Sequence, residues 1–96
     1  MVNEKTVVLD IFLLMITAEQ MRGARAMLRW SAEKLAKEAG VSWPTIQRME
    51  AADGVPSSIS KNLQAVQRTL EDAGIVFIDE NGGGVGVRLR DRRDRQ

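Results

Sequence analysis

Residues 32–50, AEKLAKEAGVSWPTIQRME, decide the fold of this 96-residue chain. Gly40 divides the stretch into two segments with helical periodicity, because glycine adopts the left-handed conformation after a helix without steric cost. Ala36 is a small residue where two helices joined by a tight turn must touch. The contacts shared by these helices are expected from apolar residues of both helices and of the turn, namely Leu35, Ala39, Val41, Ile46 and Met49. The stretch therefore predicts two short helices that cross steeply.

Both helices have a start signal of their own. Ser31 predicts the beginning of a helix that runs to Ala39, since a serine side chain caps the free backbone N–H groups of the first turn. Ser42 in the same way predicts a helix that ends near Ala51. Pro44 falls in its first turn, where a missing N–H costs little.

Further elements are predicted on either side. Upstream, Thr17 and Gln20 form the pattern of a capping box for a helix that ends near Arg29. Downstream, AADGVPSS is a loop, and Ser57 or Ser58 starts a fourth helix that ends at Gly74. Its apolar stripe consists of Ile59, Leu63, Val66 and Leu70. The sequence IVFIDENGGGVGVRLR then predicts a β-hairpin.

The N-terminal run at residues 7–16, VVLDIFLLMI, is almost entirely apolar. A membrane span needs about 20 such residues, so the run is too short. It also lacks the basic start and the small-residue cleavage site of a signal peptide. Its β-branched content suits a strand that pairs with the hairpin or with a second protomer. The alternative is that Met15 is the natural start and residues 1–14 are an upstream extension.

Four regions are therefore expected along the chain. Residues 1–16 form the apolar N-terminal segment, residues 17–74 a helical domain, residues 75–90 the hairpin and residues 91–96 a polar tail. No region has membrane-spanning character, and a cytoplasmic location is expected.

The composition excludes several classes of chemistry. The chain has no cysteine and no histidine, so disulfides, structural zinc sites and histidine-based catalysis are excluded. The glycine run at residues 81–86 leads into a strand rather than a helix, which is not the pattern of a phosphate-binding loop. We expect no metal site, no cofactor and no enzyme activity.

Charge is unevenly distributed, although the formal net charge is only +1. Residues 17–70 carry eight basic and five acidic side chains, and residues 88–96 carry five arginines and two aspartates. The intervening residues 71–87 carry four acidic side chains and no basic one. Local basic faces of this kind attract a polyanion even when the net charge is small.

The phrase ARAMLRWSAEKLAKEAGVSWPTIQRME resembles the first three helices of the XRE-type (Cro and phage-repressor-like) regulators. The closing AGIVFIDENGGGVGVRLR resembles a tail seen in a small subgroup of them, so the likeness covers roughly residues 15–90. It implies a mainly α, four-helix repressor-like DNA-binding domain containing a helix-turn-helix, with a C-terminal β-hairpin. In that family the third helix lies in the major groove and the second crosses the backbone.

This resemblance implies particular contacts with double-stranded DNA. Base contacts are expected from Trp43 and Pro44 to thymine methyl groups, from Gln47 to adenine and from Arg48 to guanine. Phosphate contacts are expected from four polar side chains, namely Arg25, Lys34, Ser42 and Thr45. An exposed tryptophan also suits a groove between proteins, so both roles stay open for Trp43.

Three further residues bear on the same interface. Family members often have a glutamine at the position of Ala32, which contacts the DNA backbone or braces the recognition helix. Its absence leaves that contact to Lys34 or Arg25. Glu50 is expected to make a structural ion pair or to cap the turn, because phosphates would repel it, and Trp30 is expected in the core.

The resemblance implies a transcriptional regulator, most simply a repressor, that acts as a homodimer on a palindromic operator. One recognition helix reads few base pairs, so two half-sites about one helical turn apart are expected. The hairpin and residues 7–16 are the candidate dimer elements, because strands with open edges readily pair. The alternative is an antitoxin or coactivator-like interaction module, with a toxin or another protein as partner.

Overall fold

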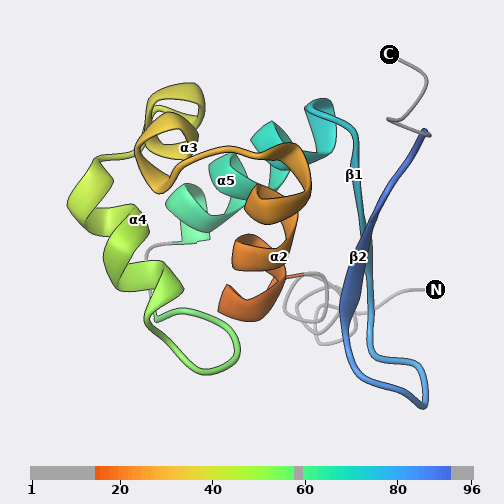
Figure 1. Ribbon diagram of the computed structural model, residues 1–96. Helices are drawn as coiled ribbons and strands as arrows, with labels where there is room; N and C mark the ends of the chain where they lie inside the picture. The colour runs from red at the N-terminus through yellow and green to blue at the C-terminus, as the bar shows by residue number, and fades with distance from the viewer. Residues whose placement is uncertain (1–14, 58–59, 92–96) are drawn as a thin grey trace, which may run out of the picture.

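The computed structural model describes residues 15–57 and 60–91 of the chain. Four helices are followed by a two-stranded antiparallel hairpin: α2 (Ala18–Leu28), α3 (Ala32–Ala39), α4 (Trp43–Glu50), α5 (Ser60–Asp72), β1 (Ile75–Ile78) and β2 (Gly86–Leu89). Figure 1 shows α2 in the middle of the molecule, α4 on one side of it and the hairpin on the opposite side. The protein is thus a small, mainly helical domain with a C-terminal hairpin. No helix in the described ranges is long and apolar enough to cross a membrane.

Some predictions fall on residues that the structure does not describe. These are most of the predicted strand at residues 7–16, the alternative extension at residues 1–14, the contributions of Ser58 and Ile59 to the fourth helix, and residues 92–96 of the polar tail. The last two residues of the predicted N-terminal segment are described and join the body of the molecule. Ile16 is buried in the hydrophobic core, and Met15 packs against it.

Helix α2 begins as predicted. The Thr17 N–H donates to Gln20 Oε1 over 2.9 Å, and the Gln20 N–H donates to Thr17 Oγ1 over 3.1 Å, which completes the capping box. The helix ends at Leu28, and Arg29 follows it in the left-handed conformation with φ 59°. The Trp30 N–H then donates to the Arg25 carbonyl over 2.9 Å, as in a Schellman motif. No glycine marks this end in the sequence, so the left-handed conformation of Arg29 was not predicted.

Helices α3 and α4 also form where they were predicted. Ser31 Oγ accepts the Lys34 N–H over 3.0 Å, and Ser42 Oγ accepts the Thr45 N–H over 3.3 Å. Gly40 has φ 69°, and the Val41 N–H donates to the Ala36 carbonyl over 3.1 Å. Each backbone signal in the sequence therefore corresponds to an observed cap.

The predicted start of the fourth helix adjoins residues 58–59, which the structure does not describe. Ser57 is exposed and irregular, and α5 begins at Ser60. Pro56, which precedes Ser57, is buried, so this end of the loop packs against the molecule. The predicted stripe is otherwise confirmed within the described residues, since Leu63, Val66 and Leu70 are all buried.

The core draws buried apolar side chains from the four helices and β1, and Val87 and Leu89 of β2 pack against it. α3 packs against α4 and α5, while α2 contacts α4, α5 and the hairpin. The buried cluster consists of Ile16, Met21, Ala24, Leu28, Leu35, Ala36, Val41, Ile46, Met49, Leu63, Val66, Leu70 and Ile75. Small residues at Ala24 and Ala36 allow the helices to approach closely. This packing fixes the direction in which the other face of α4 points.

Gly23 and Gln20 hold the hairpin against α2. A Cβ atom at Gly23 would lie 3.2 Å from Val87 Cγ2, so the glycine allows α2 and β2 to approach closely. Gln20 is buried, and its Nε2 donates to the carbonyls of Ile78 over 3.2 Å and Gly86 over 2.9 Å. Ile78 and Gly86 are partners in the strand register, so one amide binds both strands at the turn end of the hairpin.

Candidate nucleic-acid interface

Helix α4 has one face buried and one face exposed. Ile46, Met49 and Glu50 are buried. The outward side chains are those predicted to contact bases, and all four are exposed: Trp43, Pro44, Gln47 and Arg48. Trp43 retains 45% of its accessible surface, a large value for an aromatic residue. The helix thus presents one flat ring and two side chains with several hydrogen-bonding groups to an approaching molecule.

Three of the predicted contact residues are joined on this face. Ser42 Oγ donates to Thr45 Oγ1 over 2.8 Å, and Arg48 Nη2 donates to the same oxygen over 3.3 Å. The bonds link residues spaced by three along α4, where side chains are neighbours on the helix surface. Ser42 and Thr45 therefore act together with Arg48 rather than as separate groups.

Arg25 does not point to the same surface. Its Nε and Nη2 donate to the two carboxylate oxygens of Glu50, each over 2.8 Å, and its Nη1 donates to the Trp30 carbonyl over 3.0 Å. The hydrogen bond to Glu50 raises the pKa of the Arg25 guanidinium above its ordinary value. Arg22 Nη1 also donates to the Glu50 backbone carbonyl. This arrangement confirms the structural ion pair expected for Glu50 and engages the guanidinium that was predicted to bind phosphate.

The pair has a consequence for the electrostatics of α4. The Glu50 side chain is only 9% exposed, and the Arg25 side chain is 23% exposed. A bidentate guanidinium neutralises the carboxylate at close range and also satisfies its oxygens. The negative charge at the end of α4 is therefore compensated before any polyanion approaches.

Lys34 lies on α3 beside the turn that leads into that helix. The side chain is exposed, and its Nζ lies 5.2 Å from the centroid of the Trp30 ring, within the range of a cation–π contact. Trp30 itself is half-buried against the core, in agreement with its predicted role. A lysine held in this way keeps its charge at the surface while its stem covers apolar area.

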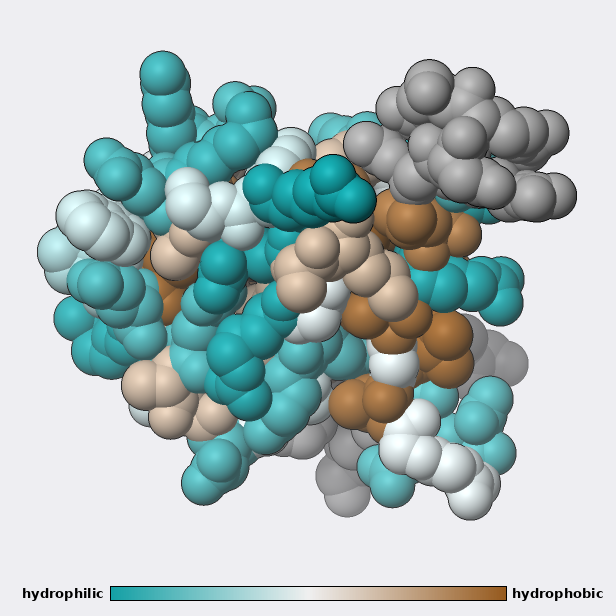
Figure 2. Space-filling view, in the orientation of Figure 1, coloured by the Kyte–Doolittle hydropathy of each residue, from teal (hydrophilic) through white to brown (hydrophobic). Residues whose placement is uncertain are grey.

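The two sides of the molecule differ in surface character. Figure 2 shows hydrophobic residues gathered over the hairpin, whereas hydrophilic residues cover most of the side formed by α3 and α4. The half-buried residues of the hairpin strands include Val76, Phe77, Ile78, Val87 and Leu89. Exposed cations on the other side come from Lys34, Lys37 and Arg48, and the exposed Glu33 and Glu38 flank the two lysines on α3. A polyanion is thus better matched by α4 and its cap than by the hairpin.

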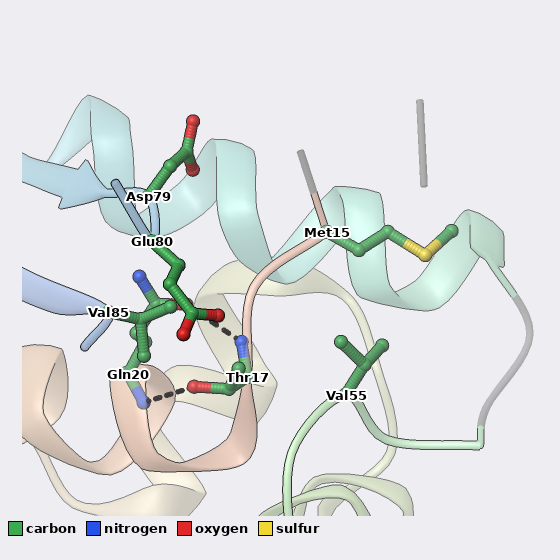
Figure 3. Close-up of a pocket in the computed structure, with 7 residues that line it drawn as sticks. All are labelled: Met15, Thr17, Gln20, Val55, Asp79, Glu80 and Val85. Atoms are coloured by element: carbon green, nitrogen blue, oxygen red, sulfur yellow. Dashed lines mark hydrogen bonds between the residues drawn. The ribbon is translucent and has the colours of Figure 1, made fainter. Parts of the chain in front are cut away.

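A hollow of about 310 Å³, which nothing in the sequence indicated, lies where the N-terminus of α2 meets the hairpin turn. It is lined by Met15, Thr17, Gln20, Val55, Asp79, Glu80 and Val85 (Figure 3). The polar groups of Thr17 and Gln20 are already bonded to each other and to the hairpin. They have little capacity left to bind a ligand, so the hollow is a less suitable site than the exposed face of α4.

The sequence predicts an ion pair for Glu50 but does not identify Arg25 as its partner. The only signal was a buried-looking acidic residue at the end of a helix together with arginines spaced by three at Arg22 and Arg25. No protein-family model matches this chain, and no curated protein matches it at a significant level of sequence similarity.

Proposed function

We propose that the protein is a sequence-specific regulator that binds double-stranded DNA through α4, with α3 and α4 forming a helix-turn-helix of the XRE type. The observation that carries the proposal is the composition of the exposed face of α4. Gln47 and Arg48 are side chains that can each make two hydrogen bonds to a purine in the major groove, and both are exposed on a helix whose opposite face is locked in the core.

The surroundings of α4 support this role. The hydroxyl of Thr45 at the start of the helix is the proposed phosphate donor, and Ser42 supports it by donating its own hydrogen to Thr45. Lys34 adds an exposed charge on the adjacent helix. Glu50, the one acidic residue of α4, is neutralised by Arg25. In this proposal Arg25 holds the end of the recognition helix through its ion pair with Glu50 instead of contacting phosphate.

We further propose a repressor that acts as a homodimer on a palindromic operator, located in the cytoplasm on the nucleoid and working without cofactor or catalysis. One α4 helix spans few base pairs, and a dimer doubles the length of sequence that is read. The hairpin, on the opposite side from α4, is the proposed dimer element.

A second candidate is a protein-interaction module such as an antitoxin or a coactivator. The observation that favours it is Trp43, because an aromatic residue exposed by 45% at the start of an exposed helical face suits a docking anchor. Antitoxins also combine both activities on one helix, so a toxin partner is compatible with DNA binding.

The testing experiment selects duplexes from a random pool and measures the affinity of the enriched sequence at two salt concentrations. We expect a palindrome whose affinity falls as salt rises, because phosphate contacts release counterions. Arg48→Ala should weaken binding by roughly 1–3 kcal/mol and relax preference at one base pair in each half-site. The matched control is Arg68→Ala, an exposed arginine on α5 away from this face.

The outcomes separate the two candidates. Equal losses for the two arginine variants would mean that only general charge matters and that α4 does not read sequence. Weak, sequence-independent binding by the unaltered protein would favour the protein-interaction module instead. In that case Trp43→Ala should abolish capture of the partner protein, while Arg48→Ala should not.

A further inference from the structure

The hydroxyl group of Thr45 is the centre of a small network on the exposed face of α4. Its oxygen accepts hydrogen bonds from Ser42 Oγ over 2.8 Å and from Arg48 Nη2 over 3.3 Å. The backbone N–H of Thr45 donates to Ser42 Oγ over 3.3 Å, so the helix cap and the network share one serine. The cap thereby fixes the position of the oxygen to which Arg48 binds.

The network uses little of the bonding capacity of Arg48. A guanidinium has five N–H donors in a rigid plane, and Thr45 takes one of them. The remaining donors suffice for a two-bond contact with guanine O6 and N7. Holding the group in place before binding removes part of the entropy that a free arginine loses when it docks.

The hydrogen of the Thr45 hydroxyl points to a second role. An aliphatic hydroxyl has two acceptor sites and one hydrogen, and both acceptor sites are occupied by Ser42 and Arg48. With Ser42 as the donor of this pair, the network does not use that hydrogen. It is left to donate outward, and a phosphate oxygen beside the contacted base is a suitable acceptor.

We propose that Thr45 is a positioning residue for base recognition: it holds the Arg48 guanidinium in the orientation that contacts guanine. This inference rests on the proposed DNA-binding function and adds the mechanism by which one side chain sets specificity. The ligand chemistry is a guanine edge in the major groove, with the adjacent phosphate bound by the threonine hydroxyl itself.

The test compares Thr45→Val with Thr45→Ser. Valine has nearly the shape of threonine but no hydroxyl, and its backbone N–H can still donate to Ser42 Oγ, so the helix cap is retained. We expect Thr45→Val to lower affinity for the selected palindrome about tenfold, because it removes both the bond that orders Arg48 and the contact of the hydroxyl with phosphate. It should also reduce the preference for guanine at the Arg48 position, while Thr45→Ser should restore both.

A second measurement needs no DNA. Nitrogen-15 relaxation of the Arg48 Nε–H in the free protein reports how ordered the guanidinium is. We expect an ordered signal in the unaltered protein and in Thr45→Ser, and a mobile one in Thr45→Val. A melting curve for each variant verifies that the fold is retained.

Together these two measurements show whether the positioning role of Thr45 or the proposed DNA-binding function is wrong. If Arg48 is equally ordered in Thr45→Val, the positioning role is wrong whatever the protein binds. If Arg48 becomes mobile but affinity and guanine preference are unchanged, the network does not serve recognition. If the unaltered protein shows no sequence-specific binding although Arg48 is ordered, the proposed function fails and the network is a structural feature of α4.

Discussion

At the scale of single residues, Gln20 connects parts of the molecule that are distant in sequence. Its Oε1 accepts the N–H of Thr17, and its Nε2 donates to the carbonyls of Ile78 and Gly86. The amide is buried, so each of these bonds is shielded from competition with water. One side chain thereby begins α2 and also attaches the hairpin to it.

Gln20→Ala should therefore lower the free energy of unfolding by about 2–3 kcal/mol, since it removes three hydrogen bonds and leaves the Thr17 N–H without its cap. Urea denaturation measures this change. Gln64→Ala is the control, because Gln64 is exposed on α5. Similar losses in the two variants would show that the bonds to the hairpin contribute nothing to stability.

At the scale of elements, the loop between α4 and α5 is tied to the start of α2. The Ala18 N–H donates to the Gly54 carbonyl over 2.9 Å, and the Gly54 N–H donates to Glu19 Oε1 over 3.2 Å. The bond of the Glu19 carboxylate to its own backbone N–H, followed by that of Gly54, lowers the pKa of Glu19 below its ordinary value. The loop is thus held by a charged acceptor at a helix N-terminus, where negative charge is favoured.

The lowered pKa predicts how this attachment depends on pH. The stabilisation is fully present above the ordinary pKa of a glutamate and is lost as the pH falls through the lower value of the folded state. We expect the Gly54 amide resonance to shift with pH in that acidic range and to become insensitive in Glu19→Gln. Glu33→Gln, at the corresponding place in the first turn of α3, is the control and should leave the Gly54 titration unchanged. A Gly54 resonance that titrates equally in Glu19→Gln would contradict the assignment.

At the scale of the whole molecule, the hairpin and α4 lie on opposite sides of α2 (Figure 1). In the described part of the chain the sheet has only the strands β1 and β2, so each has an edge without a neighbouring strand. Val76 and Ile78 lie on the face of the hairpin opposite Ile75 and Phe77. Pairing through this side leaves α4 uncovered, which a dimeric DNA-binding protein requires.

We expect sedimentation analysis to show a dimer whose dissociation constant rises about tenfold or more in Val76→Lys, since charge on an open strand opposes pairing. Met27→Lys is the control, because Met27 is exposed by 41% on α2. Melting curves establish that both variants stay folded. If the Val76→Lys protein dimerises as well as the control, the dimer contact lies elsewhere on the molecule. If the unaltered protein is a monomer, the proposed homodimer is wrong.

The sequence by itself determined the elements and the exposed face of α4, because those depend on neighbours in the chain. Ser31, Ser42 and Gly40 act on backbone groups within five residues, and the burial of Ile46 and Met49 follows from helical periodicity. Such signals are complete in a short window. They were therefore sufficient to predict which residues α4 exposes, while the DNA contacts drawn from the family resemblance stay predictions.

Only the tertiary structure decided what lies behind that face. Arg25 and Glu50 are 25 residues apart, and Gln20 bonds to carbonyls 58 and 66 residues away. An arginine on an exposed-looking helical stripe has the same local pattern whether it binds phosphate or a carboxylate. Its partner is chosen by how α2 packs against α4, and this packing depends on long-range contacts that no local window contains.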